Sequence, residues 1–256
     1  MKLEDVPGIE QKIKTASDSS LLFKGALDFF KNKAHYAEET FRIYQVQKDF
    51  TTCFFSEQST PLANGEFLKS YCFFLMNKDW IPLKVVVDQY MGKQHLFERY
   101  TTEKGENQIS YEYYNDGEEK GHKLALPTKF HIATGHISTS VLFLKGRNVE
   151  SGGKNYQNVY TSENNWKLVG PPAMQYLLLR RPYNQKVSIE LSGTQLKATM
   201  FEIYTDENYE KTKEIPMKVY LSSHFCLPYK VELPGEVEIN IRYLNQIEIM
   251  NGNFES

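Results

Sequence analysis

Short segments in which apolar and polar residues alternate recur along most of this sequence. The clearest is EVEINIRYL, in which Val237, Ile239 and Ile241 fall on one face and polar residues occupy the positions between them. A period of two indicates a β-strand with one buried and one solvated face, as in an antiparallel sheet covered on one side. The fold of this chain must therefore accommodate many such strands.

Strands of this kind follow one another at regular spacing, with short turns between them. The segments are FRIYQVQK, TTCFFSEQ, FLKSYCFFLM, IPLKVVVDQY, HLFERYTTE and NQISYEYYND in the first half, and KVSIELSG, QLKATMFEIYTD, PMKVYLSS and LPYKVEL in the second. Turns of hairpin size, such as PLANG and MGK, join antiparallel neighbours. About ten strands are too many for a flat open sheet. We predict a mainly β fold, either a curved antiparallel sheet or an incomplete barrel, with a two-sheet β-sandwich as the alternative.

Residues 19–34 depart from this pattern and predict an amphipathic helix. Leu22, Ala26 and Phe29 recur at helical spacing, and the preceding SDSS offers side-chain oxygens that cap a helix N-terminus. Gly25 lies in the middle of this segment, where glycine costs about 1 kcal/mol relative to alanine. We nevertheless expect an amphipathic helix over residues 19–34, although this glycine counts against it.

The length of 256 residues suits one large β domain. We expect a single domain over residues 1–256, with a helical segment at 1–35 and an antiparallel β body at 36–250. The prolines in the middle of the chain are too few to mark a boundary between two domains.

A short internal helix is predicted within LPTKFHIATGHISTSVLFLKG. Pro127 restricts the residue before it to an extended conformation. We expect the chain to stay extended downstream of it, from Lys129 to Ile132. From Ile137 the spacing changes, and Ile137, Val141 and Leu144 fall on one face of a short helix. Such a helix can line or fill the inner side of a curved sheet.

This segment also carries two histidines, His131 and His136, which have three readings. They could be metal ligands, a general acid or base, or structural histidines that bond backbone groups near the helix. Ser138 or Thr134 could cap the helix N-terminus. No familiar ligand spacing unites them with other donors, so we expect no metal site and no cofactor. The structural interpretation is the simplest of the three.

Composition excludes several classes of function. The chain has 30 basic and 32 acidic residues and a net charge of −2, so no basic excess favours nucleic acid. No apolar run is long enough for a transmembrane helix. The first residues carry acids and no apolar stretch, which predicts a cytoplasmic protein, or a periplasmic one if an export signal has been removed. Cys53, Cys72 and Cys226 lie in apolar settings and are expected to be buried reduced thiols.

The segment from Ile137 to Leu244 carries a further pattern. A short helix that ends near a basic residue is followed by strands reading VYTSENNW, KVSIELSG, FEIYTD, MKVYLSSHFCLPYKVEL and EVEINIRYL. This order resembles bacterial families of the lipoprotein-carrier-like superfamily, in which a curved antiparallel half-barrel wraps around helices and presents an apolar cavity. Those carriers are exported, whereas this sequence shows neither an export signal nor a lipid-attachment cysteine. A cytoplasmic variation on that fold is an enzyme, so the resemblance confers no residue roles.

The first functional expectation is that a hydrophobic or amphipathic small molecule binds in the concavity of the sheet. Aromatic residues, 17 Tyr and 16 Phe, suit the wall of such a cavity. The residues expected to line it are Tyr111, Tyr113, Phe130, His131, His136 and Phe143. The alternatives are a cofactor-independent isomerase or cyclase, with His131 or His136 as acid or base, and a protein-interaction scaffold. The sequence gives no oligomeric state.

Overall fold

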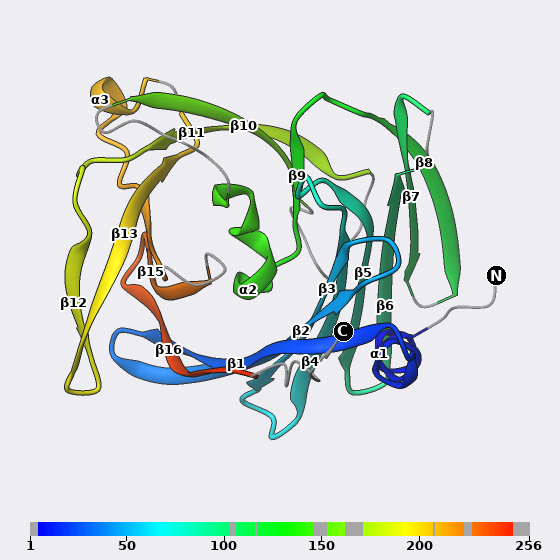
Figure 1. The fold of residues 1–256 in the computed structure, drawn as a ribbon. Helices are drawn as coiled ribbons and strands as arrows, with labels where there is room; N and C mark the ends of the chain where they lie inside the picture. Colours follow the sequence, from blue (N-terminus) through cyan, green and yellow to red (C-terminus); the bar gives the residue numbers. More distant parts are fainter. Residues whose placement is uncertain are drawn as a thin grey trace, which may run out of the picture.

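A computed structural model describes residues 5–102, 106–115, 117–145, 153–161, 171–206, 208–222 and 227–247. Its dominant feature is one large, curved sheet of 16 strands that does not close into a barrel (Figure 1). The predicted mainly β class and the curved antiparallel sheet are confirmed, and the alternative of a two-sheet sandwich is wrong.

The first eight strands form a meander in which each pairs with the next. They are β1 (Ser19–Lys31), β2 (Ala34–Val46), β3 (Thr51–Pro61), β4 (Phe67–Met76), β5 (Pro82–Met91), β6 (Gln94–Thr102), β7 (Gln108–Asn115) and β8 (Glu118–Ala125). The turns between them are short, as expected for antiparallel neighbours. Of the strand segments expected in the first half of the chain, each one falls within this meander.

The remaining strands extend the sheet from the other side of β1. They are β9 (Phe130–Ala133), β10 (Lys154–Thr161), β11 (Ala173–Arg180), β12 (Val187–Leu191), β13 (Thr194–Tyr204), β14 (Met217–Leu221), β15 (Pro228–Leu233) and β16 (Val237–Gln246). The order across the sheet is β8 to β1 and then β16, β15, β14, β13, β11, β10 and β9, while β12 pairs with β13. The strand segment VYTSENNW overlaps β10, and its residues beyond Thr161 lie outside the described part of the chain.

One pair of strands departs from the antiparallel pattern. β9 and β10 are parallel, and parallel neighbours need a crossover connection, which usually contains a helix. Here the connection carries α2 (Ile137–Ser140) and the 3₁₀ helix η1 (Leu142–Leu144). The predicted short internal helix is confirmed, and it lies inside the curve of the sheet (Figure 1).

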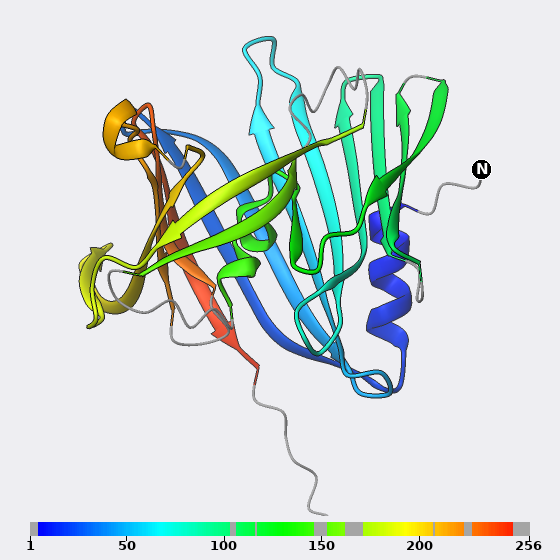
Figure 2. The same ribbon diagram turned by 90° about the horizontal axis from the view of Figure 1, so that it is seen from above.

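The N-terminal helix lies earlier than predicted. α1 (Val6–Thr15) begins at the N-cap Asp5, whose carboxylate accepts a hydrogen bond from the Gly8 amide at 2.7 Å. Pro7 stands in its first turn, a position where proline's missing N–H costs nothing. The helix packs against the outer face of the sheet (Figure 2), where Val6 and Ile9 are buried.

The helix expected over residues 19–34 is wrong, because this segment forms β1. It pairs along its length with β2 on one side and β16 on the other. Burial in the middle of a large sheet outweighs a weak helical periodicity. Gly25 has a role in the strand, since a Cβ atom there would collide with the ring of Phe41.

The sheet buries both faces of its first half, but with different partners. The outer face of β2 to β6 packs under α1, and the inner face packs against α2 and η1 in the largest core of the molecule. Cys53 and Cys72, on outer and inner faces respectively, are buried free thiols, as expected. Cys226 lies outside the described residues.

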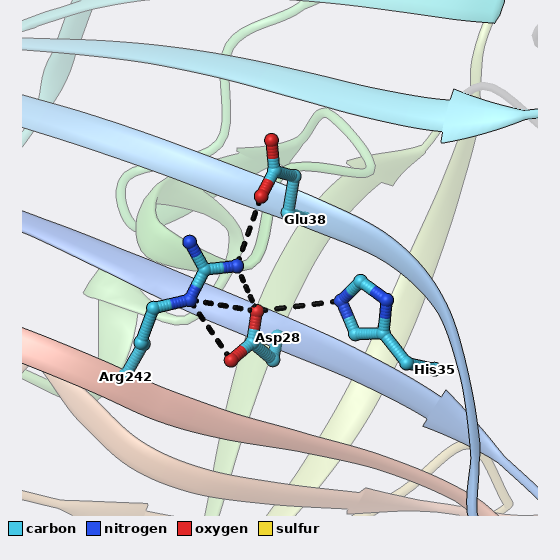
Figure 3. Close-up of polar contacts among 4 residues, drawn as sticks. All are labelled: Asp28, His35, Glu38 and Arg242. Carbon is cyan, nitrogen blue, oxygen red and sulfur yellow. Dashed lines mark hydrogen bonds and ion pairs between the residues drawn. The ribbon is translucent and has the colours of Figure 1, made fainter.

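A cluster of charged side chains ties the first strands of the sheet to the last (Figure 3). The guanidinium group of Arg242 on β16 donates hydrogen bonds to Asp28 on β1 and, at 2.9 Å, to Glu38 on β2. His35 lies 3.4 Å from the carboxylate of Asp28. The hydrogen bond from Arg242 lowers the pKa of Asp28. This cluster marks the seam at which the two halves of the sheet join.

A further short helix, α3 (Tyr209–Thr212), connects β13 with β14. None of the helices in the described ranges is long and apolar enough to cross a membrane.

Candidate functional site

The first turn of α2 is capped from across the sheet. His136 is the N-cap residue but makes no cap hydrogen bond with its side chain. Instead, the carboxylate of Glu39 on β2 accepts hydrogen bonds from the Ile137 amide at 2.8 Å and from the Ser138 amide at 3.1 Å. The Ser138 hydroxyl also contacts Glu39. The cap expected from Ser138 or Thr134 is therefore replaced by a residue from a distant strand.

Glu39 is completely buried, and its environment changes its titration. Burial raises the pKa of the Glu39 carboxyl from the ordinary value of 4.5 to about 7, although the hydrogen bonds from Ser138 and Ile137 oppose this shift. A carboxylate at the N-terminus of a helix is favoured by the helix dipole, but α2 is too short for a large effect. Loss of water is therefore the dominant influence on this group.

His136 fixes the same turn to the neighbouring strands. Its Nδ1 lies 2.7 Å from the Ser56 hydroxyl on β3, and its Nε2 lies 2.7 Å from the Ser70 hydroxyl on β4. Gln89 on β5 extends the network by donating to Ser70 at 3.3 Å. Burial lowers the pKa of His136 to about 3. The ring is therefore neutral near pH 7, and both nitrogens are satisfied by hydroxyl groups.

His131 lies deeper, between two aromatic rings. It stacks on Phe74 with ring centroids 5.1 Å apart and contacts Phe143 at 5.3 Å. Its Nε2 lies 2.9 Å from the backbone carbonyl of Thr139, so Nε2 donates in this pair. Burial lowers the pKa of His131 to about 4. This backbone contact matches the structural interpretation of the histidine pair.

The predicted aromatic residues pack into the same interior. Tyr111 and Tyr113 on β7 are buried, and the Tyr111 hydroxyl lies 3.4 Å from a Glu98 carboxylate oxygen, which also accepts from Tyr100 at 2.9 Å. Phe130 is buried in the same core. These side chains fill the space over the first half of the sheet.

A pocket lies on the other side of α2 and η1, and we call it the inner pocket. Its volume is about 380 Å³. Its lining is mostly apolar and comes from α2, η1, strands β9, β10, β11, β13, β14 and β15, and the loops beside them. The lining residues are Ala133, Gly135, Ile137, Ser140, Val141, Phe143, Val159, Thr161, Gln175, Leu177, Ile203, Thr205, Glu214, Ile215, Met217, Leu233 and Pro234. Of the six residues predicted to line a cavity, the structure places Phe143 in this wall and the other five in the packed interior.

The buried polar residues that hold α2 were not predicted from the sequence. Glu39 shares its strand face with Ala37, Phe41 and Ile43, all of which are buried. A charged residue in register with apolar inward-facing neighbours is the signal that could have identified it. Ser70 stands in the same relation to Cys72 and the other inward residues of β4.

No group of three or more His, Cys, Asp or Glu side chains that could hold a metal ion occurs among the residues the structure describes.

Comparisons with known proteins add information on the fold alone. No protein-family model matches the sequence, and no curated protein matches it. A solved structure of a β-barrel-like protein of the domain-of-unknown-function family DUF1849 from Brucella abortus is similar, with a TM-score of 0.53 and 8% identity over 89% of this chain and 98% of that chain. A DUF1089 family protein from Pseudomonas aeruginosa gives a TM-score of 0.47 and 12% identity over 81% of this chain and 93% of the other. The first likeness supports a β-barrel-like architecture.

Proposed function

We propose that this protein binds a hydrophobic or amphipathic small molecule in the inner pocket. The observation that carries this proposal is an apolar hollow of about 380 Å³ between the internal helix and the inner face of the sheet. Ligand pockets typically measure about 300–1,000 Å³ and combine apolar walls with a few polar groups. The resemblance of the sequence to carrier-like half-barrels supports the same role.

The energy available from such a pocket is sufficient for binding. Burial of apolar surface contributes about 25 cal/mol per Å², so about 200 Å² of ligand surface contributes about 5 kcal/mol before the costs of association. A ligand with one or two hydrogen bonds at its polar end gains further affinity. We therefore expect weak binding, closer to the millimolar than to the picomolar range.

The residues predicted for this site have two kinds of role in the proposal. Phe143 contacts the ligand, because it belongs to the pocket wall. His131 and His136 lie behind that wall, completely buried and neutral near pH 7, and hold the internal helix in place. Tyr111 and Tyr113 shape the packed interior beside them.

Two other hollows are less suited to an apolar ligand. They measure about 430 and 480 Å³ and lie next to β16. Charged residues contribute to both linings, Arg242 to the first and Glu238 to the second. Of these three hollows, the inner pocket has the most apolar wall.

Binding of an uncharged apolar fluorophore, N-phenylnaphthylamine, tests the proposal. We expect saturable binding at one site, and at least a tenfold loss of affinity in Leu177→Trp, because the larger ring occupies the pocket. Met174→Trp is the matched control, since Met174 is exposed on the outer face of the same strand, β11. This variant should bind as the unmodified protein does.

Thermal melts should show that both variants remain folded, because overpacking costs about 1–3 kcal/mol. The proposal is wrong if the fluorophore shows no saturable binding, or if a folded Leu177→Trp variant binds it with unchanged affinity.

A further inference from the structure

The polar groups of the inner pocket are few and carry one sign of charge. Of the described residues that line it, Glu214 is the one with an ionisable side chain, and none is Lys, Arg or His. Lys213 precedes Glu214 in the chain but does not belong to the lining. The electrostatic character of the pocket is therefore set by a carboxylate.

Glu214 is held in a fixed position beside the pocket. One of its carboxylate oxygens accepts hydrogen bonds from the Thr205 amide and hydroxyl, each at 2.8 Å, and the other accepts from the Asp206 amide at 3.0 Å. An ionised carboxylate has about four acceptor positions, so these three bonds leave room for a further donor. The residue is half-buried, and Ile215 beside it is exposed.

A second polar group in the wall has no partner from the protein. The Thr161 hydroxyl is buried and makes no hydrogen bond within the described part of the chain, and Thr161 lies at the end of β10. Thr161 pairs with Ala173 on β11, whereas Tyr204, next to Thr205, pairs with Leu178, so Thr161 lies at the other end of the pocket from Glu214. Ser140 and Gln175 also contribute to the lining.

The deeper wall is apolar and has no such groups. Four buried residues form this wall. Val141 lies just before η1, and the others, Val159, Leu177 and Ile203, lie on β10, β11 and β13. The pocket thus combines an apolar wall with a few hydroxyl and amide groups and one carboxylate, which accepts hydrogen bonds and does not donate them. Glu214 would repel an anionic ligand, and no cationic side chain in the described lining would offset that repulsion.

Resting on the proposed function, we propose that the inner pocket selects apolar molecules whose polar end donates a hydrogen bond and is not anionic, such as alkyl alcohols and alkylamines. Alkyl carboxylates are disfavoured. The hydroxyl or ammonium group lies beside Glu214, and the alkyl chain lies along the wall formed by Val159, Leu177 and Ile203.

Displacement of bound N-phenylnaphthylamine by three probes with the same alkyl chain tests this selectivity. At pH 8, decylamine and decanol should each displace the fluorophore with at least tenfold higher affinity than decanoate, and decylamine should bind at least as tightly as decanol. The Glu214→Gln variant should remove the advantage of decylamine over decanol and strengthen decanoate binding at least threefold, because it removes the charge but keeps one acceptor oxygen.

Glu118→Gln is the matched control, since Glu118 is exposed on β8 and the variant changes the net charge equally. It should leave the three affinities unchanged.

The results separate the two proposals. Equal or tighter binding of decanoate, or an unchanged ratio of the three affinities in Glu214→Gln, overturns the selectivity while the pocket remains a binding site. Failure of the fluorophore and of all three probes to bind overturns both proposals.

Discussion

The inner faces of the two halves of the sheet meet the same internal helix in different ways. Across β2 to β5, Glu39, Ser56 and Ser70 bond the first turn of α2 and its N-cap His136, and apolar side chains fill the remaining space. Across β10 to β14, the inner face is apolar and leaves a pocket of about 380 Å³ beside α2 and η1. The first half of the sheet therefore holds the internal helix in place, and the second half leaves a pocket beside it.

The difference follows from which side of the helix faces which strands. The Ser138 hydroxyl bonds Glu39 on β2 and the Thr139 hydroxyl contacts Cys72 on β4. Ile137, Ser140 and Val141 face the pocket instead. Buried polar groups must be paired, so the anchoring half tolerates little change. The pocket half has free volume and should tolerate more.

The largest expected effect comes from removing the anchor. Glu39→Ala leaves the amides of Ile137 and Ser138 buried without partners, at roughly 1–3 kcal/mol each, so we expect a loss of about 4 kcal/mol in the free energy of unfolding. The measurement is urea denaturation at about pH 5.5, where the carboxyl is mostly protonated.

Glu38→Ala is the control for that variant, because Glu38 lies on the outer face and its ion pair with Arg242 is exposed. Exposed pairs contribute about 0–1 kcal/mol. Equal losses in the two variants would show that the inner network does not anchor the helix.

The pH dependence of stability is the second test of the anchoring half. The pKa of Glu39 is raised from 4.5 to about 7 in the folded protein, so between these values the folded state binds a proton that the unfolded state has lost. Stability contributed by this group is therefore present at low pH and is lost as the pH rises toward 7. The difference between 4.5 and about 7 corresponds to about 3 kcal/mol.

Comparison with Glu39→Gln isolates this effect, because the contributions of His131 and His136 are common to both proteins and cancel. Relative to Glu39→Gln, the unmodified protein should lose about 3 kcal/mol between pH 4.5 and pH 7 and no more above pH 8. Parallel stability curves for the two proteins would mean that Glu39 titrates normally.

The smallest expected effect compares one truncation in each half. Val87→Ala removes a buried side chain from the filled inner face of β5 and creates a new cavity, whereas Val159→Ala enlarges a pocket that already exists. Since the cost of truncation grows with the cavity that remains, we expect about 2 kcal/mol for Val87→Ala and about 1 kcal/mol for Val159→Ala. Thermal or chemical denaturation measures the free energy of unfolding of each variant. A larger loss for Val159→Ala than for Val87→Ala would mean that side chains already fill the space beside Val159.

Much of the architecture could be predicted from the sequence, because apolar and polar residues alternate along most of the strands. FLKSYCFFLM matches β4 residue for residue, and Ile137 begins the internal helix as predicted. The errors arose where tertiary context overrides local pattern. β1 has residues at helical spacing but lies between β2 and β16, and β8 is a charged edge strand without alternation.

The site was harder to predict than the fold. The two histidines drew attention because of their chemistry, but both serve to position the helix behind the pocket wall. The apolar wall residues Val159, Leu177 and Ile203 come from three separate strands, and no local signal distinguishes a residue that lines a hollow from one that fills a core. Pairing across the sheet, which decides this, is absent from a single sequence.

A methyl-resolved NMR titration with decanol tests the difference between the two halves most directly. We expect the methyl signals of Val159, Leu177 and Ile203 to shift progressively to saturation. Those of Ile43, Val85 and Val87, on the filled inner face, should remain in place. Shifts centred on Ile43, Val85 and Val87, or no shifts in either set, would contradict this expectation.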